Sequence, residues 1–271
     1  MTSTVAFLGL GAMGAPMARN LLKAGCALRV WNRSAARTQP FADTGITVCD
    51  SIATAVQGAG FVVSIVADDA ASRAVMLGQH GVMAAAGAAR GIAYLDAPVS
   101  GSVPQATSGE LVFMVGGDAA ALAKAQPLLA AMGKQTITIG PSGHGATVKL
   151  INNMLSAVMN TAVAEAVMVA QADGLDPEPV KQLLNEGPAG SRLTRTKLPK
   201  VFARDFAPQF ALALMEKDMR YFLALAQDLD RPVPLASLAR SQLQAARVAG
   251  FGGLDVSAVH YQVTGERPTQ R

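Results

Sequence analysis

Lys149 is the residue of this chain whose setting most suggests chemistry. It lies in an otherwise apolar, helix-like run, and the next polar positions are Asn153, Ser156 and Asn160. Steps of four, three and four residues place these side chains on one face of a helix. A buried ammonium is costly unless it is paired, and desolvation lowers its pKa toward the range useful for proton transfer. Most lysines are exposed, so a solvent-facing Lys149 is the alternative that the rest of the chain has to outweigh.

A glycine-rich turn near the N-terminus predicts a dinucleotide site. Val5–Leu8 reads as a buried parallel strand, and it leads into Gly9-Leu10-Gly11-Ala12-Met13-Gly14 and then a helical stretch from Ala15 to Ala24. In such a turn the first glycine allows the tight bend, the second lets backbone N–H groups approach a pyrophosphate, and the third lets helix and strand pack closely. The N-terminus of the following helix adds partial positive charge toward the anion.

The end of the second strand bears on which dinucleotide binds. Residues 27–31 read as that strand, and Asn32-Arg33-Ser34 follow it. An acidic residue here would accept hydrogen bonds from the ribose hydroxyls of NAD and repel a 2′-phosphate. Arg33, helped by Ser34 and Arg37, instead offers donors to that phosphate. We therefore expect NADP to be preferred while NAD can also bind; a solvated surface arginine is the alternative.

Hydrophobic periodicity divides the chain into two predicted domains. In residues 1–141 strands alternate with helices, which predicts a doubly wound α/β sheet with a cofactor at the carboxyl ends of its strands, around Gly9, Asn32 and Val66-Ala67. The predicted strands after the second are Ile46–Val48, Phe61–Val66, Ala93–Asp96, Leu111–Val115 and Thr136–Ile139. Residues 142–271 read as helices only, beginning with a long one that reaches about Asp173.

Composition excludes several classes of function. The chain has 271 residues, 51% of them apolar, a net charge of +4 and no basic tract with interleaved aromatics, so we expect no nucleic-acid partner. Cys26 and Cys49 lack metal-ligand spacing, the histidines are far apart in sequence, and we expect no metal. The cysteine usage and the start of the chain, which shows no export signal, predict a cytoplasmic protein.

The long predicted helix is apolar, but it is a poor membrane span. Asn152, Asn153, Asn160 and Glu165 interrupt it, which favours burial inside a globular protein. The alanine-rich faces of this and the later helices predict contact with a second subunit, as in a homodimer or homotetramer. A monomer whose two domains alone bury those faces is the alternative.

Four motifs in order give the chain a family resemblance. They are Gly9–Gly14, Asp96-Ala97-Pro98-Val99-Ser100-Gly101, Met114-Val115-Gly116-Gly117 and Lys149-Leu150-Ile151-Asn152-Asn153. Together they resemble the β-hydroxyacid dehydrogenase family, the 3-hydroxyisobutyrate dehydrogenase-like enzymes, from Val5 to about His260. The resemblance implies a Rossmann-like N-terminal domain, a joining helix and an all-helical C-terminal domain. It also implies reversible NAD(P)-dependent oxidation of a short 3-hydroxy acid to a semialdehyde or keto acid.

The same resemblance implies roles for particular residues. The catalytic lysine falls on Lys149 and its partner on Asn153, while Ser100 with the backbone around Gly101 and Ser102 would hold the substrate carboxylate. Lys217, supported by Asp218, matches a lysine near the nicotinamide end of the cofactor; an exposed helix surface is the alternative for this pair. Hydride addition to a carbonyl builds negative charge on oxygen, and a lysine can donate a proton to it. We expect Lys149 to do so in a cleft between the domains.

This chain departs from the family pattern in two places. Ser102 stands where the family usually has a second glycine, which would reshape the substrate pocket. Between Met83 and Tyr94 the chain is too short for a strand-helix unit that the family normally has, so one edge of the cofactor pocket is open or the sheet closes with one strand fewer. Two alternatives follow: a dinucleotide-binding protein with impaired or no turnover, or an imine reductase-like enzyme. Imine reductases typically lack the catalytic lysine, so Lys149 argues against the second.

Overall fold

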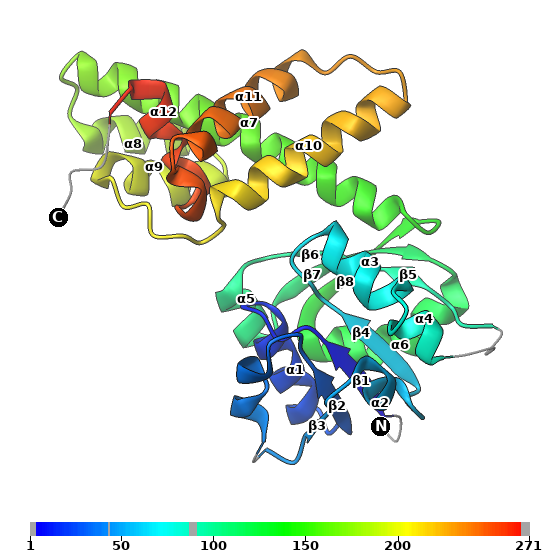
Figure 1. Ribbon diagram of the computed structural model, residues 1–271. Helices are drawn as coiled ribbons and strands as arrows, with labels where there is room; N and C mark the ends of the chain where they lie inside the picture. The colour runs from blue at the N-terminus through cyan, green and yellow to red at the C-terminus, as the bar shows by residue number, and fades with distance from the viewer. Residues whose placement is uncertain (1–3, 43, 87–90, 267–271) are drawn as a thin grey trace. The chain divides into compact units, whose positions relative to one another are not determined.

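The structure is a computed structural model that describes residues 4–42, 44–86 and 91–266 (Figure 1). The chain forms two compact units, Met1–Ala146 and Thr147–Arg271. Within the described residues the first unit contains every strand, β1 to β8, and from residue 147 onward the chain is helical. This confirms the predicted order of an α/β half followed by an all-helical half.

Strand β1 (Val5–Leu8) is buried on both of its faces. It lies between β2 (Leu28–Trp31) and β4 (Phe61–Ser64), and β3 (Thr47–Val48) extends the same parallel sheet beyond β2. Side chains of a strand alternate between faces, so Val5 and Phe7 join one apolar cluster while Ala6 and Leu8 join another. A strand that is apolar at every position is typical of a parallel sheet with helices on both sides.

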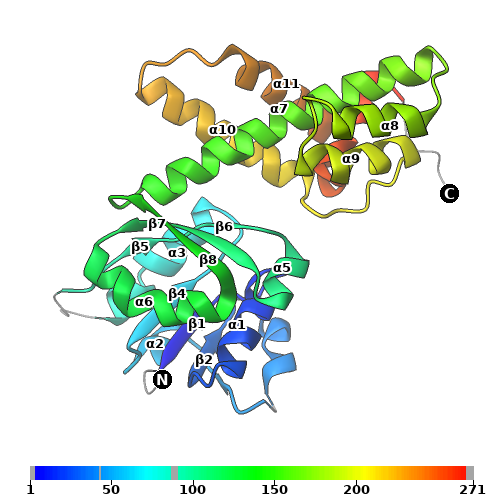
Figure 2. The same cartoon turned by 180° about the vertical axis from the view of Figure 1, so that it is seen from behind.

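The helices of the first unit supply those two layers. The first cluster includes residues of α1 (Gly14–Lys23), α5 (Val103–Ser108) and α6 (Ala119–Met132), which are seen in Figure 2. The second cluster includes residues of α2 (Ile52–Val56), α3 (Asp69–Leu77) and α4 (Val82–Ala85). Asp118 caps the start of helix α6, because its carboxylate accepts a hydrogen bond from Ala121 N at 2.9 Å.

The remaining strands form a second sheet, which corrects the prediction of one continuous sheet. β7 (Leu111–Gly117) pairs antiparallel with β5 (Leu95–Asp96) and β6 (Val99–Ser100), and parallel with β8 (Gly133–Gly140). Among the described residues β4 pairs only with β1, so its other edge has no strand beside it. This agrees with the predicted loss of a strand-helix unit after Met83. Residues 87–90, in the middle of that segment, lie outside the described ranges.

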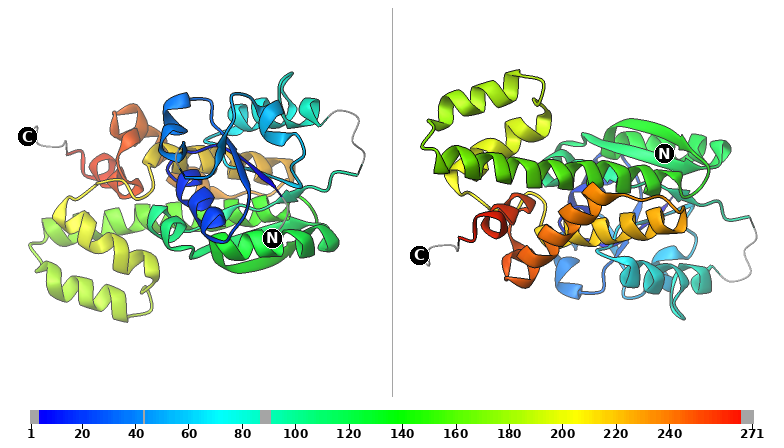
Figure 3. Two further views of the ribbon diagram at one scale, coloured as in Figure 1. Left: turned by 90° about the horizontal axis from the view of Figure 1, so that it is seen from below. Right: turned by 90° about the horizontal axis from the view of Figure 1, so that it is seen from above.

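The second unit is built on the long helix α7 (His144–Ala172). It is followed by α8 (Pro177–Glu186), α9 (Arg192–Ala203), α10 (Leu212–Asp228), α11 (Pro234–Val248) and α12 (Val259–Thr264). Figure 3 shows α10 and α11 running side by side, in yellow to orange. Short 3₁₀ turns occur at Ala35–Arg37, Gln39–Phe41, Phe251–Gly253 and Val256–Ala258.

Helix α7 is the one described helix long and apolar enough to cross a membrane, judged by length and composition alone. In its most apolar stretch 44% of the residues are buried inside the structure. Buried helices in the cores of globular proteins share these features, and Ala157, Ala164 and Val167 are fully buried in the core of this unit. The same core receives Leu198 of α9 and Met219 of α10.

A buried carboxylate fixes the segment that leads into α10. Asp255 is fully buried; its Oδ1 lies 2.7 Å from Lys197 Nζ of α9, and its Oδ2 accepts hydrogen bonds from the backbone N–H groups of Gln209 and Phe210. Burial would raise the pKa of Asp255, but the hydrogen bonds from Lys197 and Ser257 outweigh it and hold that pKa below its usual value. The carboxylate therefore stays charged and holds this segment in place.

Candidate active site

The glycine turn has the geometry that a dinucleotide requires. Gly9 has φ +106°, and a Cβ on it would lie 2.1 Å from Ile65 O, so only glycine fits there. A Cβ on Gly14 would lie 2.0 Å from Gly9 O. The lack of a side chain at Gly14 therefore lets α1 pack directly against the turn. Gly11 differs, because a Cβ on it would meet no atom within 4 Å. The protein itself gives no reason for glycine at this position, whereas a pyrophosphate lying against the backbone does.

The carboxyl ends of β1, β2 and β4 meet at this turn, as the sequence predicts. Gly9 N donates to Trp31 O at 2.9 Å, and Ile65 N donates to Leu8 O at 3.0 Å. Asn32 supports the turn, because its Oδ1 accepts a hydrogen bond from Leu10 N at 2.8 Å. Val66 and Ala67 continue the chain just beyond Ile65. A nicotinamide dinucleotide therefore fits the residues that the structure brings together here.

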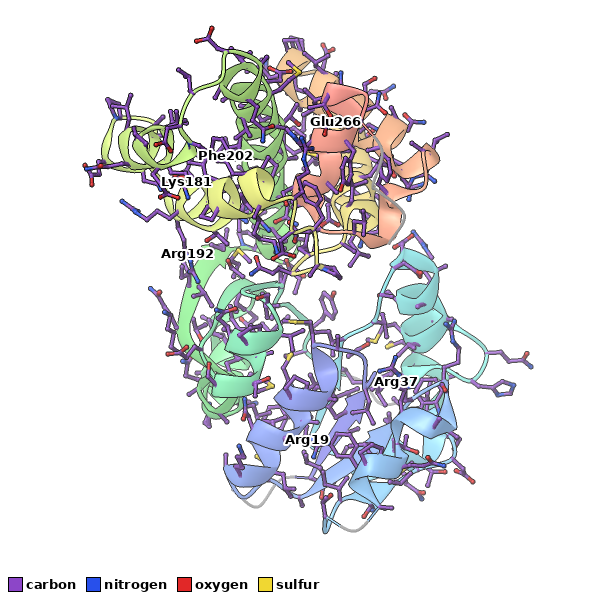
Figure 4. All side chains as sticks on the ribbon, turned by 90° about the vertical axis from the view of Figure 1, so that its left-hand side faces the viewer. Arg19, Arg37, Lys181, Arg192, Phe202 and Glu266 are labelled. Carbon is purple, nitrogen blue, oxygen red and sulfur yellow. The ribbon has the colours of Figure 1, made fainter. Side chains whose placement is uncertain are left out.

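Three of the side chains predicted to select the cofactor are free of the protein interior. Arg33, Ser34 and Arg37 are all exposed, and Figure 4 labels Arg37 in the first unit. Asn32 Nδ2 donates to Ser34 O at 3.0 Å, which ties this segment to the end of β2. The two guanidinium groups follow the strand that carries the ribose-binding position in this fold.

The predicted carboxylate-binding turn lies at the end of β6. Ser100 is half-buried, and Gly101 has φ +128° with a Cβ position 2.9 Å from Leu111 Cδ2 and 3.1 Å from Gln105 Cβ. Ser102 then serves as the N-cap of α5. Its backbone N–H and its hydroxyl both lie 2.9 Å from Gln105 Oε1. The sequence prediction included Ser102 but not this partner.

Asp96 links the strand before that turn to the start of α7. It is buried, its Oδ1 accepts a hydrogen bond from Gly143 N at 2.7 Å, and its Oδ2 accepts one from Ala146 N at 2.7 Å. Gly116 and Gly145 make room for it, since a Cβ on either would lie within 2.8 Å of a carboxylate oxygen. Lys149 follows Ala146 by three residues on the same helix. Sequence reasoning gave Asp96 no role, although its place in a motif next to Ser100 was a signal.

In the second unit a polar cluster joins α7 to α10. Asn153 is buried, and its Nδ2 donates to Asp218 Oδ2 at 2.6 Å. Asp218 Oδ1 lies 3.2 Å from Lys217 Nζ, and Asn153 Oδ1 accepts a hydrogen bond from Asn152 at 3.1 Å. The Asn153 amide is therefore held by Asn152 on one side and Asp218 on the other. Lys217 and Asp218 are partly buried, with side-chain exposures of 25% and 14%.

Lys149 belongs to the same electrostatic environment. Burial lowers the pKa of Lys149 from its ordinary value of 10.5; the Asp218 carboxylate opposes this shift, and the Lys217 ammonium adds to it. Within the described residues Lys149 Nζ has no hydrogen-bond or ion-pair partner, so a substrate oxygen can take that place. A lysine with a lowered pKa beside a fixed carboxylate is suited to giving and accepting a proton.

The described residues contain no group of three or more His, Cys, Asp or Glu side chains that could hold a metal ion. Cys26 and Cys49 are buried free thiols, and burial raises the pKa of each.

Comparison with known proteins gives the family. A sequence profile described as the NAD-binding domain of NADP-dependent 3-hydroxyisobutyrate dehydrogenase matches residues 143–262. The 3-sulfolactaldehyde reductase of Escherichia coli is 33% identical over 96% of this chain and 96% of its own length. The 3-hydroxyisobutyrate dehydrogenase of Pseudomonas aeruginosa is 33% identical over 94% of this chain and 96% of its own. The chain belongs to the β-hydroxyacid dehydrogenase family. Its relatives are dehydrogenases and reductases, and the chain is an NAD(P)-dependent oxidoreductase of hydroxy acids.

A solved structure supports the same assignment. The 3-hydroxyisobutyrate dehydrogenase of Mycobacterium tuberculosis, determined with L-serine, superposes with a TM-score of 0.87 at 31% identity, covering 97% of this chain and 99% of that one. The profile of the NAD-binding domain of 6-phosphogluconate dehydrogenase matches this chain in two pieces, residues 4–88 and 83–140. The pieces overlap at residues 83–88, at the start of the segment that the sequence predicts to be shortened. The family fold thus continues on both sides of the shortened segment.

Proposed function

We propose that this protein is an NADP-preferring dehydrogenase that reversibly oxidises a small 3-hydroxy acid to its semialdehyde or keto acid. The observation that carries the proposal is the cluster of Lys149, Asn153, Lys217 and Asp218, in a chain that also has a dinucleotide-binding turn. When bound, the nicotinamide supplies the hydride acceptor. The protein supplies the proton transfer and the alignment of the substrate.

Each group has a part in this mechanism. Ser100 and the N–H groups of the following turn hold the substrate carboxylate, which aligns the reacting carbon. Neutral Lys149 accepts the hydroxyl proton during oxidation, and its ammonium returns a proton to the oxygen during reduction. Asn153 holds Asp218, and the Asp218 carboxylate stabilises the ammonium form of Lys149. We expect Lys217 to lie near the nicotinamide end of the cofactor, as the family resemblance implies.

The test is turnover of a panel of 3-hydroxy acids that differ in the substituent next to the carboxylate, with Lys149→Met as the control. We expect NADP-dependent oxidation of at least one acid. The variant should lose about 10²- to 10⁴-fold in kcat, the usual contribution of a general acid or base. Full activity in Lys149→Met would refute the mechanism. A wild-type protein that binds NADPH but turns over nothing would favour the alternative of a dinucleotide-binding protein without catalysis.

Cofactor preference is tested separately by fluorescence titration with NADPH and NADH. Arg33→Ala should weaken NADPH binding and leave NADH binding nearly unchanged, because only NADPH carries the 2′-phosphate that an arginine can bind bidentately. Equal losses for both cofactors would contradict the preference. We place the activity in the cytoplasm, which the two free, buried thiols favour.

A further inference from the structure

The turn proposed to hold the substrate carboxylate already contains an internal acceptor. Gln105 stands at the third position of α5 and reaches back to its N-cap. Its Oε1 is 2.9 Å from Ser102 N and 2.9 Å from Ser102 Oγ, so one amide oxygen takes both the N–H and the hydroxyl hydrogen of Ser102. Each of these donors can serve only one strong acceptor at a time.

A carboxylate arriving at this turn needs the same donors. Carboxylates are acceptor-only groups that are bound by converging N–H and O–H groups. With the Ser102 donors occupied, the turn offers the hydroxyl of Ser100 and the N–H of Gly101. The stem of Gln105 lies close to Gly101, whose Cβ position would be 3.1 Å from Gln105 Cβ. The amide oxygen is therefore held beside the turn.

We infer that Gln105 competes with the carboxylate of the substrate for the donors of Ser102 and so sets the affinity of the enzyme for small carboxylate substrates. This inference rests on the proposed function, because it takes the Ser100–Ser102 turn as the carboxylate site. The substrate carboxylate has to displace the Gln105 amide before it can accept hydrogen bonds from Ser102. The contact is lost equally in the ground state and the transition state, so it affects KM and leaves kcat unchanged.

Helix α5 does not depend on this contact for its position. Ala106 is fully buried against α1, and its carbonyl oxygen accepts a hydrogen bond from the buried Asn20 Nδ2 at 2.8 Å. The helix also ends at Gly109, which has φ +73°. Removing the Gln105 amide should therefore leave the fold of the first unit intact, and circular dichroism and thermal unfolding can verify this.

The experiment compares Gln105→Met and Gln105→Ala with the wild type, using 3-hydroxypropionate as the probe. We expect KM, and the Kd measured by NMR titration in the presence of NADP, to fall by about three- to tenfold, the range that one net hydrogen bond contributes. kcat should stay the same. Gln105→Glu keeps the acceptor and adds a negative charge, so KM should rise.

A matched control removes a similar contact far along the chain. Thr194 Oγ1 accepts a hydrogen bond from the N-cap Ser191 N at 2.9 Å in α9, and Thr194→Val should leave KM unchanged. A KM and Kd for Gln105→Met that are equal to or higher than those of the wild type would overturn the inference. The two proposals fail separately. If the wild type shows no turnover but Gln105→Met still binds 3-hydroxypropionate more tightly, the proposed activity is wrong and the role of Gln105 stands.

Discussion

At the scale of single residues, the proposed chemistry depends on how Asp218 and Lys217 shift the pKa of Lys149. The two neighbours have opposite charges and move the pKa of Lys149 in opposite directions. Asn153 fixes the orientation of Asp218 through a 2.6 Å hydrogen bond, so a neutral amide acts on the lysine through a carboxylate. A lysine alone on α7 would have only burial to lower its pKa.

This arrangement predicts two opposite shifts in the pH profile. In the oxidation direction Lys149 must be neutral, so kcat/KM should rise with pH through its pKa. Asp218→Asn removes the influence that raises this pKa, so the rising limb should move to lower pH. Lys217→Gln removes the influence that lowers it, so the limb should move to higher pH. Both are read from kcat/KM measured across the neutral and alkaline range.

The control for these variants is Asp228→Asn, which changes an exposed carboxylate at the end of the same helix α10. Its pH profile should coincide with that of the wild type. If Asp218→Asn and Lys217→Gln moved the limb in the same direction, Lys149 would not be the group that titrates. In the reduction direction the same limb should appear as a fall in activity with rising pH, because the ammonium form is then required.

At the scale of secondary structure, Asp96 is the residue that fixes the start of α7. Its carboxylate accepts two backbone hydrogen bonds of 2.7 Å, from Gly143 and Ala146. Asp96→Asn keeps the shape but can accept only through one oxygen, which leaves a backbone N–H unpaired at a cost of about 1–3 kcal/mol. Since Lys149 is one helical turn further on, kcat should fall about tenfold or more, because small misplacements of a reacting group are costly.

The matched variant for Asp96 is Asp118→Asn, because Asp118 caps α6 in the same unit. It should change stability little, because asparagine and aspartate are about equally good N-caps, and it should keep kcat. Chemical denaturation measures the first quantity and steady-state kinetics the second. In Asp96→Asn the pH limb should stay in place while kcat falls, since Asp96 acts on position and not on the charge of Lys149. Unchanged kcat in Asp96→Asn would limit Asp96 to a stabilising role.

The elements show where sequence patterns were sufficient. The glycine turn, β1, α6 and the long helix follow from local signals: apolar runs, a capping aspartate and a stripe of polar residues on one face. The bounds of helix α9 were not predicted, because Pro199 and several charged residues obscure its periodicity, although Ser191 caps it with a side-chain contact. The pairing of Ser102 with Gln105 could not be predicted in this way, because it depends on the Gln105 side chain folding back to the N-cap of its own helix. The division into two sheets depends on which strands pair with each other across the chain, and local patterns do not show this.

At the scale of the whole molecule, the exposed face of α7 predicts self-association. Leu155 is 54% and Val169 61% exposed, and Ile151, Ala162 and Ala166 are exposed beside them at helical spacing. An exposed apolar stripe of this kind can pair with its own copy about a twofold axis. We propose that this face contacts a second subunit, as the sequence predicts for a homodimer or homotetramer.

Light scattering after size-exclusion chromatography tests this proposal. Leu155→Asp combined with Val169→Asp should convert the assembly to a smaller species, because each buries a charge in the contact. Asp228→Asn changes an exposed carboxylate of α10, outside this stripe, and should leave the mass unchanged. A wild-type protein that is monomeric at micromolar concentration would contradict the proposal. So would a double variant of unaltered mass.

The unpaired edge of β4 has a consequence for how this family can be altered. Between Met83 and Tyr94 the chain is shorter than the family pattern, yet the glycine turn, the Ser100 turn and the lysine cluster are all present. The junction is therefore a natural grafting point, where segments from longer relatives can be spliced in beside β4 while every reacting group stays on its own scaffold. Chimaeras made there would reveal what the additional segment contributes to catalysis, in a chain whose natural sequence is already short at this place.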